Sequence, residues 1–217
     1  MDKKYRRIRN VLRILFRHLG HLEVVGVEHV PLEGAFILTT NHISRLDTPL
    51  LGVTCPRQIH ALVAAKYKHH PLFRWFVNAV DGIWVRRTAF DREALMKALR
   101  VLKEGGVIGI APEGTRSPTA TLQPGRPGAA FLAARLNVPI VPVGVAGTEQ
   151  FLPSLASLRY PELRVTYGEP FRLPKTGRLS SEEMAEATDL IMRRIASLLP
   201  SAYRGIYAGV DLQVASG

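Results

Sequence analysis

Short apolar runs alternate with longer amphipathic segments along most of this chain, and the alternation limits the folds open to it. Runs with strand character occupy residues 22–27, 34–40, 59–65, 81–87, 107–111, 138–147 and 162–170. Segments with helical periodicity lie among them, at residues 71–80, 91–106, 128–137 and 180–199. Parallel strands need long crossover connections, which are usually helices. We therefore expect an α/β fold with a mixed, substantially parallel sheet flanked by helices.

Local signals mark the ends of several elements. Asp91 is positioned to cap the helix that follows it, and Gly105 is positioned to end that helix. Ser180 and Glu183 have the spacing of a capping box at the start of the last helix. Two prolines in the run 138–147 predict an edge strand or an irregularity, because proline has no N–H to donate to a neighbouring strand.

Length and composition favour one α/β domain at residues 21–200, preceded by a basic helix at 1–20 and followed by a tail at 201–217 without clear periodicity. Hydrophobic residues make up 47% of the 217 residues, which is too much for a disordered chain. The single cysteine, Cys55, excludes an internal disulfide framework and fits a reducing compartment. It precedes a proline and has no histidine nearby in sequence, so we interpret it as a buried or inert thiol.

The first eighteen residues hold seven lysines and arginines and one aspartate, which is more than half of the net charge of +11. Their apolar residues recur at helical spacing, and arginines cover much of the opposite face; the apolar set is Tyr5, Ile8, Leu12, Leu15, Phe16 and Leu19. This pattern is typical of a helix lying on an anionic membrane surface. The alternative is a helix packed on its own domain with a solvated basic face.

Several partners and locations follow from this charge and its distribution. No apolar run is long enough to span a bilayer, and the N-terminus lacks a secretory h-region. We therefore expect a peripheral or monotopic protein on the cytoplasmic face of a membrane, whose fold at residues 21–200 would survive deletion of residues 1–19. The charge also permits a nucleic-acid-binding protein, but aromatic and basic residues do not interleave, so no nucleic-acid partner is expected.

The stretch "TTNHISRLDTPLL", residues 39–51, places His42 five positions before Asp47. On one regular helix the two side chains would point to different faces. They meet if His42 follows a strand and Asp47 lies in the first turn of the next helix, where Pro49 is tolerated. A carboxylate on one imidazole nitrogen leaves the other free to accept a proton. The pair is thus either catalytic or a loop histidine beside a helix-capping aspartate. Ser44 lacks the setting of a hydrolase nucleophile.

The stretch "APEGTRS", residues 111–117, follows a predicted buried strand. Arg116 is a natural phosphate ligand, and Glu113 either pairs with it or holds a substrate hydroxyl. The alternative is a surface ion pair in a turn. Arg86 and Arg87 end another strand and supply either a second phosphate contact or two solvated cations. No phosphate-binding glycine loop, dinucleotide fingerprint or histidine–cysteine metal cluster is present in the sequence.

Four stretches in order, "NHISRLD", "DGIWVRR", "PEGTRS" and "VPIVPV", resemble the motifs of the 1-acyl-glycerol-3-phosphate acyltransferase family. The resemblance spans roughly residues 21–170. "PEGTRS" matches completely. In the second motif Arg87 falls on the family's arginine, whereas Asp81 stands where glycine is usual and Arg86 where an acid is common. The resemblance therefore bears on the chemistry more than on the choice of acceptor.

The resemblance implies a role for each matched residue. His42 would deprotonate an acceptor hydroxyl, and Asp47 would orient it. The oxygen would attack the thioester of an acyl-CoA or acyl carrier protein without a covalent acyl-enzyme, and without metal or cofactor. The residues implied in substrate binding are Asn41, Arg87, Glu113, Gly114, Thr115 and Arg116. The expected acceptor is lysophosphatidic acid, giving phosphatidic acid; the alternatives are glycerol 3-phosphate, another lysophospholipid or a glycolipid.

Overall fold

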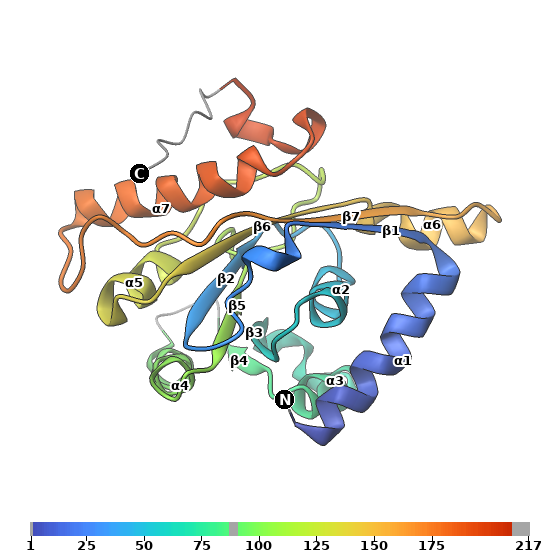
Figure 1. Ribbon diagram of the computed structural model, residues 1–217, viewed down its shortest axis with the longest axis horizontal. Coiled ribbons are helices and arrows are strands. Elements are labelled where there is room, and N and C mark those ends of the chain that lie inside the picture. Colours follow the sequence, from blue (N-terminus) through green and yellow to red (C-terminus); the bar gives the residue numbers. More distant parts are fainter. Residues whose placement is uncertain (1, 87–90, 210–217) are drawn as a thin grey trace.

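The computed structural model describes residues 2–86 and 91–209, which contain one seven-stranded sheet (Figure 1). The strand order is β1-β7-β6-β2-β5-β3-β4. Every pairing is parallel except the antiparallel pairing of β6 with β7. The strands are β1 (His21–Val25), β2 (Phe36–Thr40), β3 (Ile59–Ala64), β4 (Ile83–Val85), β5 (Val107–Ile110), β6 (Ile140–Ala146) and β7 (Glu162–Tyr167). The predicted mixed, substantially parallel sheet is confirmed.

Helices cover both faces of this sheet (Figure 1). One face carries α4 (Arg92–Lys103), α5 (Gly128–Leu136) and α7 (Ser181–Ser197). The other carries α1 (Lys3–Leu19), α2 (Asp47–Thr54), α3 (Pro71–Ala79) and α6 (Phe151–Ala156). Each face buries its own apolar cluster against the strands, so the sheet is covered on both sides, as is usual for parallel strands.

The predicted helix-end signals are present. The Asp91 carboxylate accepts a hydrogen bond from the Ala94 N–H at 3.1 Å and caps α4. Ser180 and Glu183 form the complete capping box of α7, with both reciprocal hydrogen bonds made. Gly105 follows α4 with φ +80°, a conformation that glycine adopts without strain.

The two prolines of β6 do not place it at the sheet edge, because β6 lies between β2 and β7. Pro139 precedes the strand. Pro142 lies where the pairing toward β7 shifts register, between the Ile140–Phe171 bridge and the Val143–Tyr167 pair. Residues 167–171, which lie opposite residues 140–143, contain one additional residue over this interval. The hydrogen-bond ladder is therefore interrupted beside the proline. The edge prediction was wrong and the predicted irregularity is confirmed.

The apolar face of α1 packs on its own domain. Tyr5 and Phe16 are 3% and 1% exposed, and the Phe16 ring meets the Phe151 ring of α6 edge-on with centroids 5.5 Å apart. Leu15, expected on the same face, is instead 44% exposed. The helix α1 therefore contributes to the core. Deletion of residues 1–19 should for this reason destabilise the fold of residues 21–200, contrary to the expectation drawn from the sequence. Within the described residues, no helix combines the length and apolar character needed to cross a membrane.

The tail continues the fold as far as residue 209. Two short 3₁₀ turns, Ser201–Tyr203 and Gly205–Tyr207, follow α7, and Tyr207 is buried. The Leu122 N–H donates to the Tyr203 carbonyl at 2.9 Å, which ties the tail to the loop before α5. Cys55 is fully buried, and burial raises the pKa of its thiol to about 11. The thiol is therefore protonated and inaccessible, as predicted.

Candidate active site

The functional stretches converge because they follow strands whose ends meet at one edge of the sheet. β2 and its neighbours β5 and β6 are all parallel to one another. The loops that leave their carboxyl ends carry His42 after β2, Glu113 after β5 and Thr148 after β6. Crevices at the carboxyl ends of parallel strands are the usual position of ligand sites in α/β sheets.

His42 and Asp47 are in direct contact. The Nδ1 atom of His42 lies 2.8 Å from the Oδ2 atom of Asp47, which is the first residue of α2. The side chain of Asp47 is only 2% exposed, whereas that of His42 is 21% exposed. The predicted geometry, with the histidine after a strand and the aspartate in the first turn of the next helix, is confirmed.

The Asp47 carboxylate is also held by three further donors. Its Oδ2 atom accepts hydrogen bonds from the backbone N–H groups of Ile43 at 2.9 Å and Ser44 at 2.8 Å. Its Oδ1 atom accepts the hydroxyl of Thr148 at 2.5 Å. The aspartate thus both stabilises the turn before α2 and orients the imidazole. It is the first residue of α2 and accepts from N–H groups that precede the helix, so it does not cap α2 as the second alternative expected. Thr148 was missed, because a single threonine after β6 carries no motif of its own.

Glu113 is buried beneath the loop instead of lying on its surface. It is 3% exposed, and its carboxylate accepts the N–H groups of His42 at 2.7 Å and Gln123 at 3.0 Å. Burial raises the pKa of Glu113 to about 7, and the two backbone donors oppose that rise. No ion pair joins it to Arg116 within the described residues, so the surface-pair alternative was wrong. The Glu113 carboxylate therefore fixes the backbone of His42 through the His42 N–H.

A second hydrogen bond fixes the same backbone from the other side. The Ser117 N–H donates to the His42 carbonyl at 2.8 Å, so the loop after β5 grips both peptide groups of His42. Gly114 makes this loop turn, with φ +69° and an N–H bonded to the Ala111 carbonyl at 3.0 Å. The "PEGTRS" stretch therefore positions the histidine in addition to presenting Arg116.

Asn41 links two strands. It is 1% exposed, its amide donates to the Val145 carbonyl at 2.8 Å, and its carbonyl accepts the Val145 N–H at 2.8 Å. Both polar atoms of the side chain are engaged in extending the β2–β6 pairing beyond Thr40. The structure thus corrects its expected place at the substrate: it is a positioning residue at the base of the His42 loop.

The arginines predicted to bind phosphate have different surroundings. Arg116 and Thr115 are exposed and line a groove beside His42. Arg86 is exposed and pairs with Asp91 at 3.5 Å. Arg87 lies outside the described residues. Gly114 offers no side chain, and its role is confined to the backbone turn.

A groove of about 730 Å³ begins at His42 and runs along α3. Arg45, Thr115 and Arg116 join His42 in the lining, at what we call the polar end of the groove, and Lys66 and His70 line it as well. The remainder is mainly apolar and includes Leu72, Phe73, Trp75, Phe76 and Val77 from α3. The described residues include no cluster of three or more histidine, cysteine, aspartate or glutamate side chains arranged to hold a metal ion. The site thus places the imidazole of His42, oriented by Asp47, at one end of a mainly apolar groove.

Comparisons with known proteins agree with this arrangement. Residues 21–146 match the family model described as Acyltransferase, so the chain belongs to that family. It is 26% identical over 198 residues to a 1-acyl-sn-glycerol-3-phosphate acyltransferase of Bacillus subtilis, covering 89% of this chain and 96% of that protein. It is 35% identical over 133 residues to the protein of the same name from Saccharomyces cerevisiae, covering 58% of this chain and 43% of that protein.

A third relative is matched over only part of its length, and one solved structure shares the fold. The sheep 1-acyl-sn-glycerol-3-phosphate acyltransferase alpha is 29% identical over 155 residues, which cover 65% of this chain and 52% of that protein. The chain therefore spans about half or less of its sheep and yeast relatives. The 1-acyl-sn-glycerophosphate acyltransferase PlsC from Thermotoga maritima superposes with a TM-score of 0.69 at 24% identity, covering 89% of this chain and 79% of that one.

Proposed function

We propose that this protein transfers a fatty acyl group from a thioester to the free hydroxyl of lysophosphatidic acid, giving phosphatidic acid. The observation that carries the proposal is the His42–Asp47 pair, 2.8 Å apart, at the end of a 730 Å³ groove that is mainly apolar. Relatives named 1-acyl-sn-glycerol-3-phosphate acyltransferase support the reaction and the acceptor. The thioester is an acyl-CoA or an acyl carrier protein.

The contacts of His42 support a role as general base. With its Nδ1–H donated to Asp47, the imidazole keeps a lone pair on Nε2, which has no hydrogen bond to any described residue. Nε2 takes the proton of the acceptor hydroxyl while the oxygen attacks the thioester carbonyl carbon. The tetrahedral species then breaks the carbon–sulfur bond, and the proton passes from His42 to the departing thiolate. The ester forms directly, without an acyl-enzyme.

The groove and its mouth divide the substrates. The apolar wall along α3 suits the acyl chain of the donor, because burying hydrocarbon from water contributes roughly 25 cal/mol per Å². Arg116 at the polar end holds the acceptor phosphate, since a guanidinium binds phosphate through two parallel hydrogen bonds. This arrangement brings the acceptor hydroxyl and the thioester together at His42.

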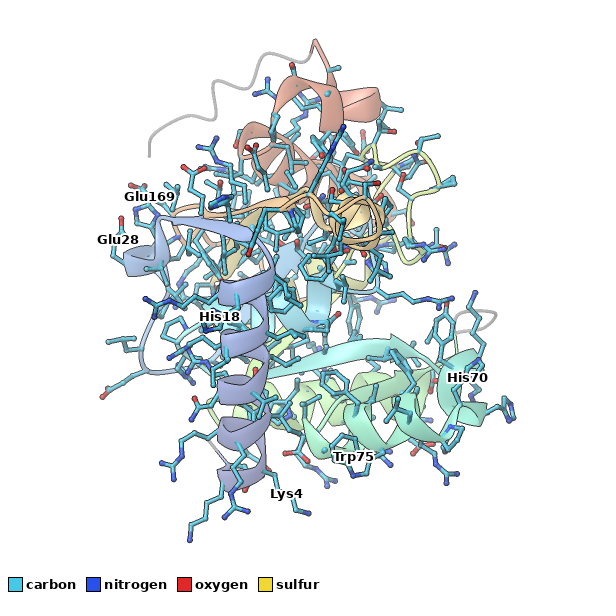
Figure 2. All side chains as sticks on the ribbon, turned by 90° about the vertical axis from the view of Figure 1, so that its right-hand side faces the viewer. Lys4, His18, Glu28, His70, Trp75 and Glu169 are labelled. Atoms are coloured by element: carbon cyan, nitrogen blue, oxygen red, sulfur yellow. The ribbon has the colours of Figure 1, made fainter. Side chains whose placement is uncertain are left out.

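The surface formed by α1 and α3 supports docking on an anionic membrane. One face of α1 is exposed to solvent along its length. Its residues recur at helical spacing and are Lys4, Arg7, Val11, Ile14 and His18. Figure 2 looks onto this surface, with Lys4 and His18 along α1, Trp75 to its right and His70 at the far right of the view. A cleft of about 580 Å³ between the helices is lined by Lys4, Arg7, Arg74 and Trp75. Cations beside exposed apolar side chains are typical of contact with anionic lipid, here on the cytoplasmic face of the membrane.

The test is an acyl-transfer assay with purified protein. Both donors, acyl-CoA and acyl carrier protein, are paired with lysophosphatidic acid, glycerol 3-phosphate and a neutral lysophospholipid, and His42→Ala is the matched inactive control. We expect phosphatidic acid to form from lysophosphatidic acid at a higher kcat/KM than product forms from either other acceptor. A preference for glycerol 3-phosphate would replace the proposed acceptor, and equal turnover by His42→Ala would remove the proposed base.

A further inference from the structure

A second cavity lies on the opposite side of the loop that carries "PEGTRS". Its volume is about 320 Å³, and it opens between α4 and α5. Within the loop, Ala111, Pro112 and Gly114 line this cavity, whereas Thr115 and Arg116 line the groove. Leu62 of β3 lines both spaces. The two spaces therefore flank the segment that grips the backbone of His42.

The floor of this cavity is apolar. The strands contribute Leu62 from within β3 and the last residues of β4 and β5, Val85 and Ile110. The helices α4 and α5 add Ala94, Leu95, Ala98, Ala129 and Leu132. The small alanines on the facing helices keep the slot between them open. Such a floor suits a hydrocarbon chain and would leave the amide groups of a pantetheine arm unpaired.

The mouth of the cavity is cationic. Arg126 lies there, exposed, with no ion pair to any described residue, and Arg86 is partly neutralised by Asp91. The Arg126 side chain lies against Gly114: a β-carbon on that glycine would come within 2.7 Å of its Cδ and 2.9 Å of its Nε. Arg126 thus lies over Gly114, which is two residues before Arg116 in the loop. The N-terminus of α5, at Gly128, adds positive potential to the same place.

We infer that this cavity is the acceptor site: it holds the acyl chain of lysophosphatidic acid, and Arg126 at its mouth binds the phosphate together with Arg116 of the same loop. The inference rests on the proposed function. That reaction brings together two substrates with one hydrocarbon chain each, and the protein has one apolar space on each side of the loop beside His42. The free hydroxyl of the acceptor lies between its chain and its phosphate, so an acceptor seated here presents that hydroxyl at the loop.

Two variants test the site independently. Arg126→Ala removes the guanidinium, with Arg126→Lys as the conservative change and Arg135→Ala, an exposed arginine at the other end of α5, as the matched control. Gly128→Phe fills the mouth of the cavity. A β-carbon at Gly128 meets no atom within 4 Å, so the new side chain enters open space without displacing the core. Gly128→Ala is its matched control.

The readouts are the separate KM values for acceptor and donor, and the ratio of kcat/KM for a long-chain over a short-chain lysophosphatidic acid. We expect Arg126→Ala to raise the acceptor KM roughly tenfold and Arg126→Lys to restore part of it. We expect Gly128→Phe to abolish the preference for the long chain. Both should leave the donor KM within about twofold of the wild-type value, and the controls should match the wild type.

The two proposals fail in different ways. If the wild-type protein does not acylate lysophosphatidic acid, the proposed function is wrong. If it does, but Arg126→Ala leaves the acceptor KM unchanged or Gly128→Phe leaves the chain preference unchanged, the acceptor site is wrong and the reaction stands. A raised donor KM with an unchanged acceptor KM would assign the cavity to the donor and overturn the inference. Circular dichroism and the unfolding midpoint establish that each variant is folded.

Discussion

The buried carboxylate of Glu113 accepts the backbone N–H of His42 at 2.7 Å and that of Gln123 at 3.0 Å, so it holds the histidine loop against the loop before α5. A motif residue that the sequence associates with substrate binding is thus part of the support beneath the proposed base. Glu113 fixes the backbone of His42 and Asp47 fixes its ring, so the orientation of the imidazole toward the groove is set by two separate contacts.

Glu113 should make stability depend on pH. Because burial raises its pKa from 4.5 to about 7, the folded protein binds a proton that the unfolded chain has lost over this range. Stability should therefore fall as pH rises from about 4.5 to 7, by an amount on the order of 3 kcal/mol. In Glu113→Gln this dependence should disappear, as measured by urea unfolding at several pH values. Parallel curves for the two proteins would contradict the assignment.

His42→Ala should abolish transfer while the protein remains folded. The side chain is partly exposed, and among the described residues it hydrogen-bonds to Asp47 alone, so its loss leaves little unpaired. Loss of a general base costs roughly 10²- to 10⁴-fold in kcat. Asp47→Asn should lower kcat as well, and should also lower the unfolding midpoint, because the buried carboxylate accepts hydrogen bonds from Ile43, Ser44 and Thr148. An unchanged midpoint for Asp47→Asn would contradict this structural role.

Arg116→Ala should act on acceptor binding. Arg116 lines the polar end of the groove and is exposed, so its removal should leave folding unchanged. The KM for lysophosphatidic acid should rise roughly tenfold or more, as expected for losing a charged hydrogen-bond donor to phosphate. A neutral lysophospholipid supplies the comparison, and Arg159→Ala, at another exposed position, is the control variant. A KM that does not change would remove Arg116 from the phosphate site.

The exposed face of α1 should control membrane binding without affecting the fold. Val11 and Ile14 are 66% and 61% exposed, so Val11→Ser with Ile14→Ser should weaken binding to anionic vesicles at an unchanged unfolding midpoint. Binding of the wild-type protein should also weaken with added salt. Phe16→Ala provides the contrast, because removing this buried ring should cost about 3–5 kcal/mol. Undiminished vesicle binding by the double variant would locate the membrane contact elsewhere.

The elements that could be predicted are those encoded locally. The alternation of strands and helices, the capping box at Ser180 and the helix start at Asp91 all depend on residues within a few positions of one another. The His42–Asp47 contact also belongs here, since five residues of strand end, turn and helix start connect them. The position of β6 within the sheet could not be predicted in this way, because a proline shows only that one N–H is missing and not which strands lie beside it.

The sequence by itself determined the α/β class, the motif residues and the pairing of His42 with Asp47, because short-range backbone geometry and residue chemistry are enough for these. Only the tertiary structure decided that Glu113 and Asn41 are buried supports, that Thr148 completes the hold on Asp47, and that α1 packs on its own core. It also decided that Arg126 lies over Gly114. These contacts join residues brought together by the order of strands in the sheet, which is set by the burial of both of its faces at once.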